Sequence, residues 1–214
     1  KIEGHDDVAR LTKLPIIADV AIASNKAKGK ADIVVHENQN NQMEEIFRSM
    51  RTNLQFMLKE GQKVVLFTSS TSGEGKTFNA ANLSVSFGLL GKKVILVGLD
   101  IRRPRLAELF GINDHKHGIT NLLVKDNPTI EDIYEQILPS GVNKNLDLLM
   151  AGPIPPNPAE LIARNSLDII INLLKEKYDY IMIDTAPVGL VTDTLQIARV
   201  ADASIYMCRA DYTP

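Results

Sequence analysis

The segment from Lys63 to Thr77 constrains the fold of this chain more than any other. An apolar, strand-like run at Val64–Phe67 passes into a loop of small residues that ends in Gly75-Lys76-Thr77, and a helix-like segment follows. A buried strand, a loop without bulky side chains and a helix N-terminus together direct backbone N–H groups toward an anion. The segment therefore predicts a phosphate-binding loop, in which the Lys76 ammonium reaches the outer phosphates and the Thr77 hydroxyl binds Mg²⁺.

The loop departs from the strict phosphate-loop pattern at one position, where Ser70 replaces the first glycine. Gly73 and Gly75 remain inside the loop, where the backbone must approach a phosphate closely. We therefore expect one continuous segment to hold the phosphates of a nucleotide. The predicted nucleotide-binding residues are Ser72, Gly73, Glu74, Gly75, Lys76, Thr77 and Phe78.

Strand-like and helix-like segments alternate from Lys63 onward. The strand-like segments are continuous apolar runs, which indicates burial on both faces of a parallel sheet. We predict an α/β fold of the P-loop NTPase type, with helices on both faces and the ligand at the carboxyl ends of the strands. The expected strands are 64–68, 94–99, 146–150, 180–184 and 203–208, and the expected helices are 76–90, 130–137, 158–177 and 193–199.

The residues before the first strand divide into two parts. Residues 1–42 mix short apolar patches with polar spacers and predict an N-terminal linker or docking arm, with an edge strand at Ile33–Val35. Residues 43–58 predict an amphipathic helix that opens the domain extending to residue 214. Its apolar face carries Ile46, Phe47, Met50, Leu54 and Met57. Glu45, Arg48 and Arg51 fall on the other side, away from the core.

Two of the expected strands end in aspartate, which would complete the site. Asp184 would hold Mg²⁺ through its water shell, opposite Thr77. Asp100 would order metal-bound water or accept a hydroxyl proton. Arg102 begins a basic run and would stabilise phosphoryl charge in the transition state. The predicted catalytic residues are Lys76, Asp100, Arg102 and Asp184, and the predicted metal-binding residues are Thr77, Asp100 and Asp184.

Composition excludes several other classes of protein. A length of 214 residues suits one α/β domain. The net charge of −2 and the 5% aromatic content give no support for nucleic-acid binding. The single cysteine, Cys208, lies in an apolar run, so we expect a buried, unreactive thiol and a reducing compartment. No apolar run approaches the ~18 residues of a membrane span.

Five motifs, in matching order and spacing, resemble the catalytic domain of bacterial tyrosine autokinases of the capsular and exopolysaccharide type. They are Glu45-x-x-Arg48-x-x-Arg51 followed by Thr52-Asn53-Leu54, the phosphate loop at 68–77, Asp100-Ile101-Arg102-Arg103-Pro104, the proline-rich segment 151–161, and Ile183-Asp184-Thr185-Ala186-Pro187-Val188. Together they cover nearly the whole chain.

This resemblance implies an enzyme that transfers phosphate from Mg-ATP to tyrosine, with ATP or ADP and Mg²⁺ as cofactors. The acceptor tyrosines would cluster in a C-terminal tail and be phosphorylated between subunits of a homo-oligomeric ring. The helix that carries Glu45, Arg48 and Arg51 would lie at the ring interface. The resemblance also implies a membrane-spanning polysaccharide chain-length regulator, fused or separate, and a cognate tyrosine phosphatase. The chain would then be a cytoplasmic domain associated with an inner-membrane protein.

Three departures from the family pattern leave alternatives open. Gly98 stands where the family has its first aspartate, Ala186 replaces a proline, and the chain has no tyrosine cluster, so we expect the tail to lie outside this sequence. One alternative is an ATP-switched ATPase of the septum-site or partition type, although those proteins carry an extra lysine where this chain has Thr71. The other is a degenerate regulator that binds nucleotide without transferring phosphate, as the absence of an acid at Gly98 would allow.

Overall fold

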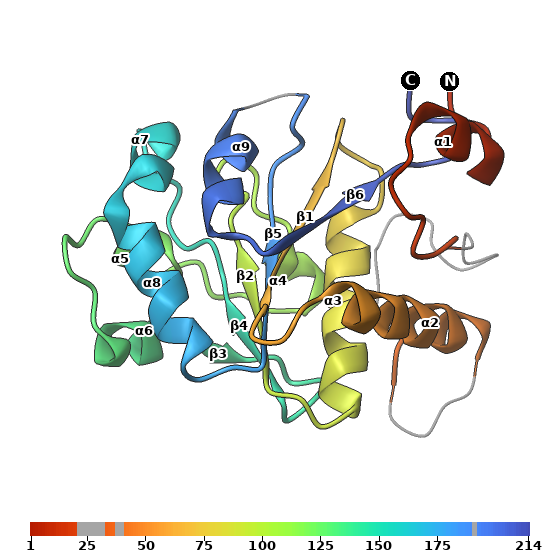
Figure 1. The fold of residues 1–214 in the computed structure, drawn as a ribbon. Helices are drawn as coiled ribbons and strands as arrows, with labels where there is room; N and C mark the ends of the chain where they lie inside the picture. The colour runs from red at the N-terminus through yellow and green to blue at the C-terminus, as the bar shows by residue number, and fades with distance from the viewer. Residues whose placement is uncertain (21–32, 37–40, 190–191) are drawn as a thin grey trace.

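The computed structural model describes residues 1–20, 33–36, 41–189 and 192–214, and these residues build a six-stranded sheet (Figure 1). Its strands are β1 (Val64–Ser69), β2 (Val94–Gly98), β3 (Leu138–Pro139), β4 (Leu146–Leu149), β5 (Tyr180–Asp184) and β6 (Ala203–Met207). Their order across the sheet is β3-β4-β2-β5-β1-β6. Neighbouring strands are parallel except β3 and β4, so the predicted α/β fold with a mostly parallel sheet is confirmed.

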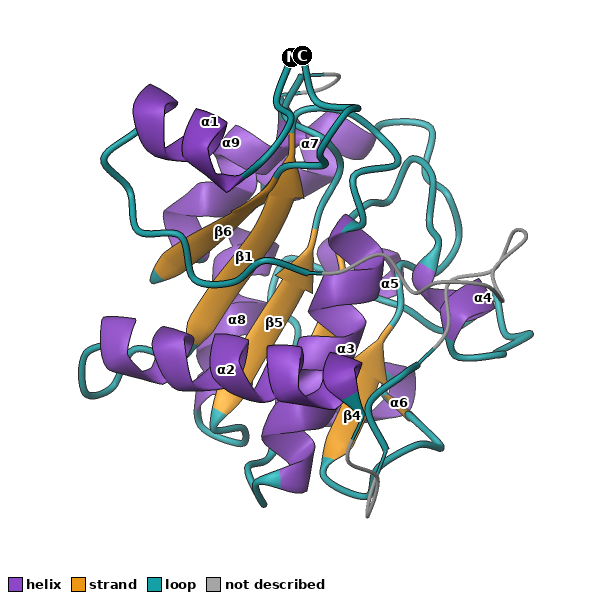
Figure 2. Cartoon of the chain, turned by 90° about the vertical axis from the view of Figure 1, so that its right-hand side faces the viewer, coloured by secondary structure: helices purple, strands orange, loops and turns teal. Residues whose placement is uncertain are grey.

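Helices cover both faces of this sheet (Figures 1 and 2). One face packs against α2 (Gln42–Met57), α3 (Lys76–Leu89) and α4 (Leu106–Leu109). The other face packs against α5 (Thr120–Leu123), α6 (Ile130–Gln136), α7 (Pro158–Ala163), α8 (Asn165–Lys175) and α9 (Asp193–Ile197), which continues into the 3₁₀ turn η1 (Ala198–Val200). A short helix, α1 (His5–Leu11), lies near the N-terminus.

Alternate side chains of each central strand enter two separate hydrophobic cores. In β1, Val64 and Leu66 join the core under α5–α8, whereas Val65 and Phe67 join the core under α2 and α3. Successive side chains of a strand point to opposite faces, so a strand between two helical layers must be apolar at every position. This packing explains the unbroken apolar runs in the sequence.

Several elements differ from the sequence expectation, and the short helices α1, α4 and α5 were not predicted. The helix expected over 158–177 breaks at Arg164, whose backbone is extended with ψ of 149°. The carbonyls of Ile162 and Arg164 accept hydrogen bonds from Arg199 Nη2 at 2.9 and 3.1 Å, which satisfies backbone groups at the break. The two-residue edge strand β3 was not predicted, because it is too short for a periodic pattern to reveal.

The arm before α2 is described only in part. Residues 33–36 form no strand, so the predicted edge strand is wrong. The N–H groups of Val34 and Val35 instead donate to Asn82 Oδ1 on α3, at 2.8 and 3.3 Å. Predicted loop and spacer residues at 21–32 and 37–40 lie outside the described residues. In the part of the chain that is described, none of the helices has the length and apolar character needed to span a bilayer.

Candidate active site

The predicted phosphate loop lies between the central strand β1 and the N-terminus of α3. Gly73 and Gly75 have φ of +88° and +84°, in the left-handed region that residues with a Cβ rarely adopt. Gly75 is the N-cap of α3, and among the described residues no side chain caps this helix end. The first backbone N–H groups of α3 are therefore available to an anion, with the positive end of the helix dipole behind them.

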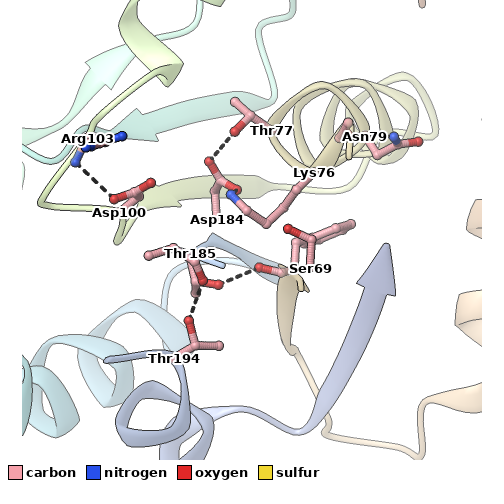
Figure 3. Close-up of polar contacts among 12 residues, drawn as sticks. Ser69, Lys76, Thr77, Asn79, Asp100, Arg103, Asp184, Thr185 and Thr194 are labelled. Carbon is pink, nitrogen blue, oxygen red and sulfur yellow. Dashed lines mark hydrogen bonds and ion pairs between the residues drawn. The ribbon is translucent and has the colours of Figure 1, made fainter. Parts of the chain in front are cut away.

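Lys76 and Thr77, the first two residues of α3, both contact Asp184 (Figure 3). Lys76 Nζ lies 2.9 Å from Asp184 Oδ1, and the Thr77 hydroxyl donates to Asp184 Oδ2 at 2.8 Å. The side chains of Lys76 and Asp184 are only 9% and 3% exposed. Asp184 occupies the carboxyl end of β5, and its register partner on the adjacent strand β1 is Phe67. Parallel pairing thus brings together three of the predicted site residues.

Asp100 follows β2 on the other side of β5. Gly98, two residues earlier, is in register with Asp184, so Asp100 leaves the sheet at the same edge. Burial raises the pKa of Asp100, as does the charge of Asp184, whereas the backbone N–H of Arg103 and the charge of Lys76 lower it. The Arg103 N–H donates to Asp100 Oδ1 at 3.1 Å. Two carboxylates and one ammonium therefore share one electrostatic environment.

Gly98 stands where the family pattern has an aspartate, and its surroundings are crowded. A Cβ at Gly98 would lie 3.2 Å from Leu106 Cδ1 and 3.3 Å from the backbone nitrogen of Ala151. Both distances are tighter than ordinary van der Waals contact. An acidic side chain here would therefore require the Leu106 side chain and the backbone at Ala151 to shift by a few tenths of an ångström.

Arg102 is held by a carboxylate that the sequence analysis did not include. Its Nε and Nη2 donate to the two carboxylate oxygens of Asp193, at 2.6 and 3.2 Å. The Asp193 side chain is 3% exposed and begins α9. The hydrogen bonds to Asp193 raise the pKa of Arg102. In this structure the guanidinium therefore links the loop after β2 to α9, and its role in stabilising phosphoryl charge stays a prediction.

The remaining predicted binding residues differ in their surroundings. The Phe78 ring packs edge-on against Phe47 of α2, with centroids 5.9 Å apart. Glu74 is buried and accepts hydrogen bonds from the Ser70 hydroxyl and the Thr71 N–H. Ser72 is exposed at the tip of the loop.

Sequence analysis missed a set of contacts to this loop from the segment after β6. The Tyr212 hydroxyl donates to the Ser72 carbonyl at 2.7 Å, and Arg209 Nη1 donates to the Gly73 carbonyl at 2.9 Å. The rule that ligands lie at the carboxyl ends of parallel strands could have identified Arg209, which follows the expected strand 203–208. Cys208, in the same segment, is half-buried, and burial together with the charge of Glu74 raises the pKa of its thiol.

The predicted interface residues on α2 do not share one environment. Glu45 and Arg48 are exposed and form an ion pair, with Oε1 and Nη1 2.7 Å apart. Arg51 is half-buried instead, and its Nη1 donates to the Ser86 carbonyl of α3 at 2.7 Å. The expectation that Arg51 faces away from the core is therefore wrong for its guanidinium, which lies against α3. The apolar face of α2 is confirmed at Phe47, Met50 and Leu54, whereas Ile46 is half-buried and Met57 is exposed.

Comparison with known sequences places this site in context. A family model described as an AAA domain matches residues 62–210. The putative tyrosine-protein kinase CapB of Staphylococcus aureus is 34% identical over 189 residues, which cover 86% of this chain and 80% of CapB. The tyrosine-protein kinase YwqD of Bacillus subtilis is 36% identical over 79% of this chain and 69% of YwqD. The putative tyrosine-protein kinase EpsB of Ralstonia nicotianae is 35% identical over 77% of this chain but only 21% of EpsB.

Solved structures show the same likeness. The BceF tyrosine kinase domain superposes with a TM-score of 0.84 at 29% identity, covering 99% of this chain and 88% of that one. The septum site-determining protein MinD of Pyrococcus horikoshii OT3, complexed with Mg-ADP, gives a TM-score of 0.55 at 26% identity and covers 68% of this chain and 57% of MinD. Nearly the whole chain is thus similar to a tyrosine kinase domain, whereas MinD matches about two thirds of it.

Proposed function

The chain belongs to the bacterial tyrosine-protein kinases and contains an AAA domain, and we propose that it is a Mg-ATP-dependent protein-tyrosine autokinase of capsular or exopolysaccharide synthesis. The observation that carries the proposal is the convergence of Lys76, Thr77 and Asp184 beside an uncapped helix N-terminus.

The residues at this site fit a magnesium nucleotide. Thr77 and Asp184 place side-chain oxygens 2.8 Å apart, and such hard oxygen donors are the ligands that Mg²⁺ prefers. The N–H groups of residues 76–78 would hold phosphate oxygens, as the chemistry of a helix N-terminus favours. When bound, the metal would neutralise charge on the outer phosphates.

Lys76 would exchange its partner when nucleotide binds. Its ammonium contacts Asp184 in this structure and would turn to an outer phosphate oxygen, where it would neutralise charge that develops during transfer. Asp184 and Thr77 would then hold the metal, Asp184 through its water shell and Thr77 through its hydroxyl oxygen. Preorganised charge and positioning would therefore supply most of the catalysis, as in other phosphoryl-transfer enzymes.

Asp100 is the proposed base for the acceptor tyrosine. Its carboxylate would accept the proton of the tyrosine hydroxyl as the phosphoryl group is transferred. Burial raises the pKa of Asp100, which makes its carboxylate a stronger base than an exposed aspartate. The neighbouring charges of Lys76 and Asp184 tie this basicity to the state of the nucleotide site.

The proposed base predicts a pH dependence. Only the ionised carboxylate of Asp100 accepts a proton, and the pKa of this group is raised. We therefore expect kcat/KM for transfer to fall as the pH decreases through this pKa, at a higher pH than for an exposed aspartate with a pKa of about 3.9. We expect Asp100→Asn to lower kcat about 10²–10⁴-fold and to remove this acid limb. Initial rates of phosphotyrosine formation between pH 4.5 and 9 test the prediction, and identical acid limbs in both proteins would contradict it.

The relatives support part of a proposal for the assembly and partners of the kinase. The match covers 80% of CapB but only 21% of EpsB. This difference supports a domain that occurs both as a separate chain and as part of a larger one. We propose a homo-oligomeric ring with Glu45, Arg48 and Arg51 at its interface, a membrane polysaccharide chain-length regulator as partner, and a cognate tyrosine phosphatase. The domain would then act on the cytoplasmic side of an inner membrane.

One experiment separates this proposal from the two alternatives. The chain is incubated with labelled Mg-ATP and a tyrosine-containing peptide, its phosphotyrosine is quantified, and its mass is measured by analytical ultracentrifugation with and without nucleotide. We expect phosphotyrosine and an assembly larger than a dimer. An ATP-dependent dimer without phosphotyrosine would indicate the MinD-like switch. Nucleotide binding with neither phosphotyrosine nor that dimer would indicate the regulator suggested by Gly98.

A further inference from the structure

The outer rim of the phosphate loop is held by residues from the far end of the sequence. Three side chains of the segment 209–213 contact three successive loop residues: Tyr212 at the Ser72 carbonyl, Arg209 at the Gly73 carbonyl, and Thr213 at the Glu74 carboxylate. Contacting residues are separated by 136 to 140 positions in the chain. A segment distant in the sequence therefore contacts three successive residues of the loop.

Glu74 is unusual because it is a buried carboxylate within a loop that we assign to phosphate binding. It is 4% exposed, and among the described residues its carboxylate pairs with no lysine, arginine or histidine. Its partners are neutral donors: the Ser70 hydroxyl at 2.9 Å, the Thr71 N–H at 3.1 Å and the Thr213 hydroxyl. Its charge would repel a polyphosphate, so its contribution must lie in geometry rather than in attraction.

Thr213 connects Glu74 to a turn that is itself well fixed. It is 5% exposed, its hydroxyl accepts from the Arg209 N–H at 2.8 Å, and its own N–H donates to the Arg209 carbonyl at 2.9 Å. Ile2 also participates: its N–H donates to the Thr213 carbonyl at 3.0 Å, and its carbonyl accepts from the Asp211 N–H at 2.7 Å. Figures 1 and 2 show both termini together at this end of the molecule.

We propose that Glu74 and Thr213 form a clasp that positions the phosphate loop for nucleotide, with Tyr212 and Arg209 as its outer contacts. The clasp turns Glu74 away from the phosphates and fixes the loop between Ser70 and Gly75, so that the N–H groups there point toward the ligand. Glu74 and Thr213 are positioning residues, since they act through the backbone of the loop. This inference deepens the proposed function, because it rests on nucleotide binding at the same loop.

The test removes the Thr213 hydroxyl while preserving the shape of the side chain. We expect Thr213→Val to weaken MgADP binding about tenfold in calorimetric titration, because one charge-assisted hydrogen bond to Glu74 is lost. Thr213→Ser keeps the hydroxyl and should restore the affinity to within about twofold of the unaltered chain. If Thr213 contributed only to stability, Thr213→Val would lower the melting temperature, but the folded protein would bind MgADP as tightly as the unaltered chain.

Tyr212→Phe provides a second, gentler variant. It removes only the hydrogen bond to the Ser72 carbonyl from a half-exposed ring, so we expect about threefold weaker binding of MgADP. Tyr206→Phe on β6 is the matched control, since Tyr206 is similarly exposed and should bind as the unaltered chain does. If Thr213→Val does not fold, the Tyr212→Phe titration decides.

Unchanged affinity in folded Thr213→Val, or in Tyr212→Phe, would overturn the clasp. The readout also separates the clasp from the proposed kinase activity. A chain that binds MgADP and responds to these substitutions, yet forms no phosphotyrosine, would refute the kinase while leaving the clasp intact.

Discussion

Lys76→Met is expected to reduce phosphotyrosine formation by about 10³-fold or more, effectively abolishing it in a protein that carries its acceptor tyrosines. The substitution removes the ammonium that would neutralise the outer phosphates and leaves a side chain of similar length. Quantitative anti-phosphotyrosine blotting and incorporation of labelled phosphate measure the loss. Lys116→Met, at an exposed lysine in the loop before α5, is the control and should keep full activity. Undiminished incorporation by Lys76→Met would contradict the assignment.

The same substitution has a cost in stability that must be separated from the loss of chemistry. Removing one partner of the buried Lys76–Asp184 pair leaves an uncompensated carboxylate, which destabilises a protein by roughly 3–5 kcal/mol. Replacing both partners, in Lys76→Met combined with Asp184→Leu, should recover much of this stability. We expect the double variant to melt close to the unaltered chain and to remain inactive. A double variant that regained activity would show that the pair is structural only.

Asp184→Asn is expected to change the metal dependence of nucleotide binding as well as activity. The substitution removes the carboxylate that would organise Mg²⁺, so phosphotyrosine formation should fall about 10²–10³-fold. It also removes the charge that competes with a phosphate for Lys76. We therefore expect Asp184→Asn to bind metal-free ADP more tightly than the unaltered chain does, and to gain little affinity when magnesium is added.

Calorimetric titrations with ADP, in chelator and in excess magnesium, measure both effects. Asp126→Asn is the matched control, because Asp126 is exposed and pairs only with Arg164 in the described structure. An Asp184→Asn protein that kept the magnesium dependence of the unaltered chain would exclude Asp184 from the metal site. A variant that lost affinity equally with and without magnesium would indicate general damage to the loop instead.

The features that sequence could predict are those carried by contiguous residues. The order of strand β1, glycine-bearing loop and helix α3 is local, so the phosphate loop and the roles proposed for Lys76 and Thr77 follow from one segment of chain. The apolar runs of β2 and β5 also indicated a parallel sheet, and the rule for strand ends then placed Asp100 and Asp184 at one edge.

The sequence could not predict contacts that join distant segments, or positions where packing against the backbone restricts the size of a side chain. The break between α7 and α8 depends on Arg199, the partner of Arg102 is Asp193, and Arg51 turns inward toward Ser86. The crowding at Gly98 likewise arises from α4 and the segment after β4. None of these contacts leaves a periodic trace, since each involves single side chains that meet only after the sheet has formed.

By itself, therefore, the sequence determined the fold class, the phosphate loop and the two acidic strand ends, because apolar burial and backbone geometry act through local patterns. Tertiary structure alone decided which groups meet: the ion pair of Lys76 with Asp184, the attachment of Arg102 to α9, and the support of Glu74 by Thr213. The physical reason is that such polar contacts depend on distance and burial, which exist only once segments far apart in the chain have packed together.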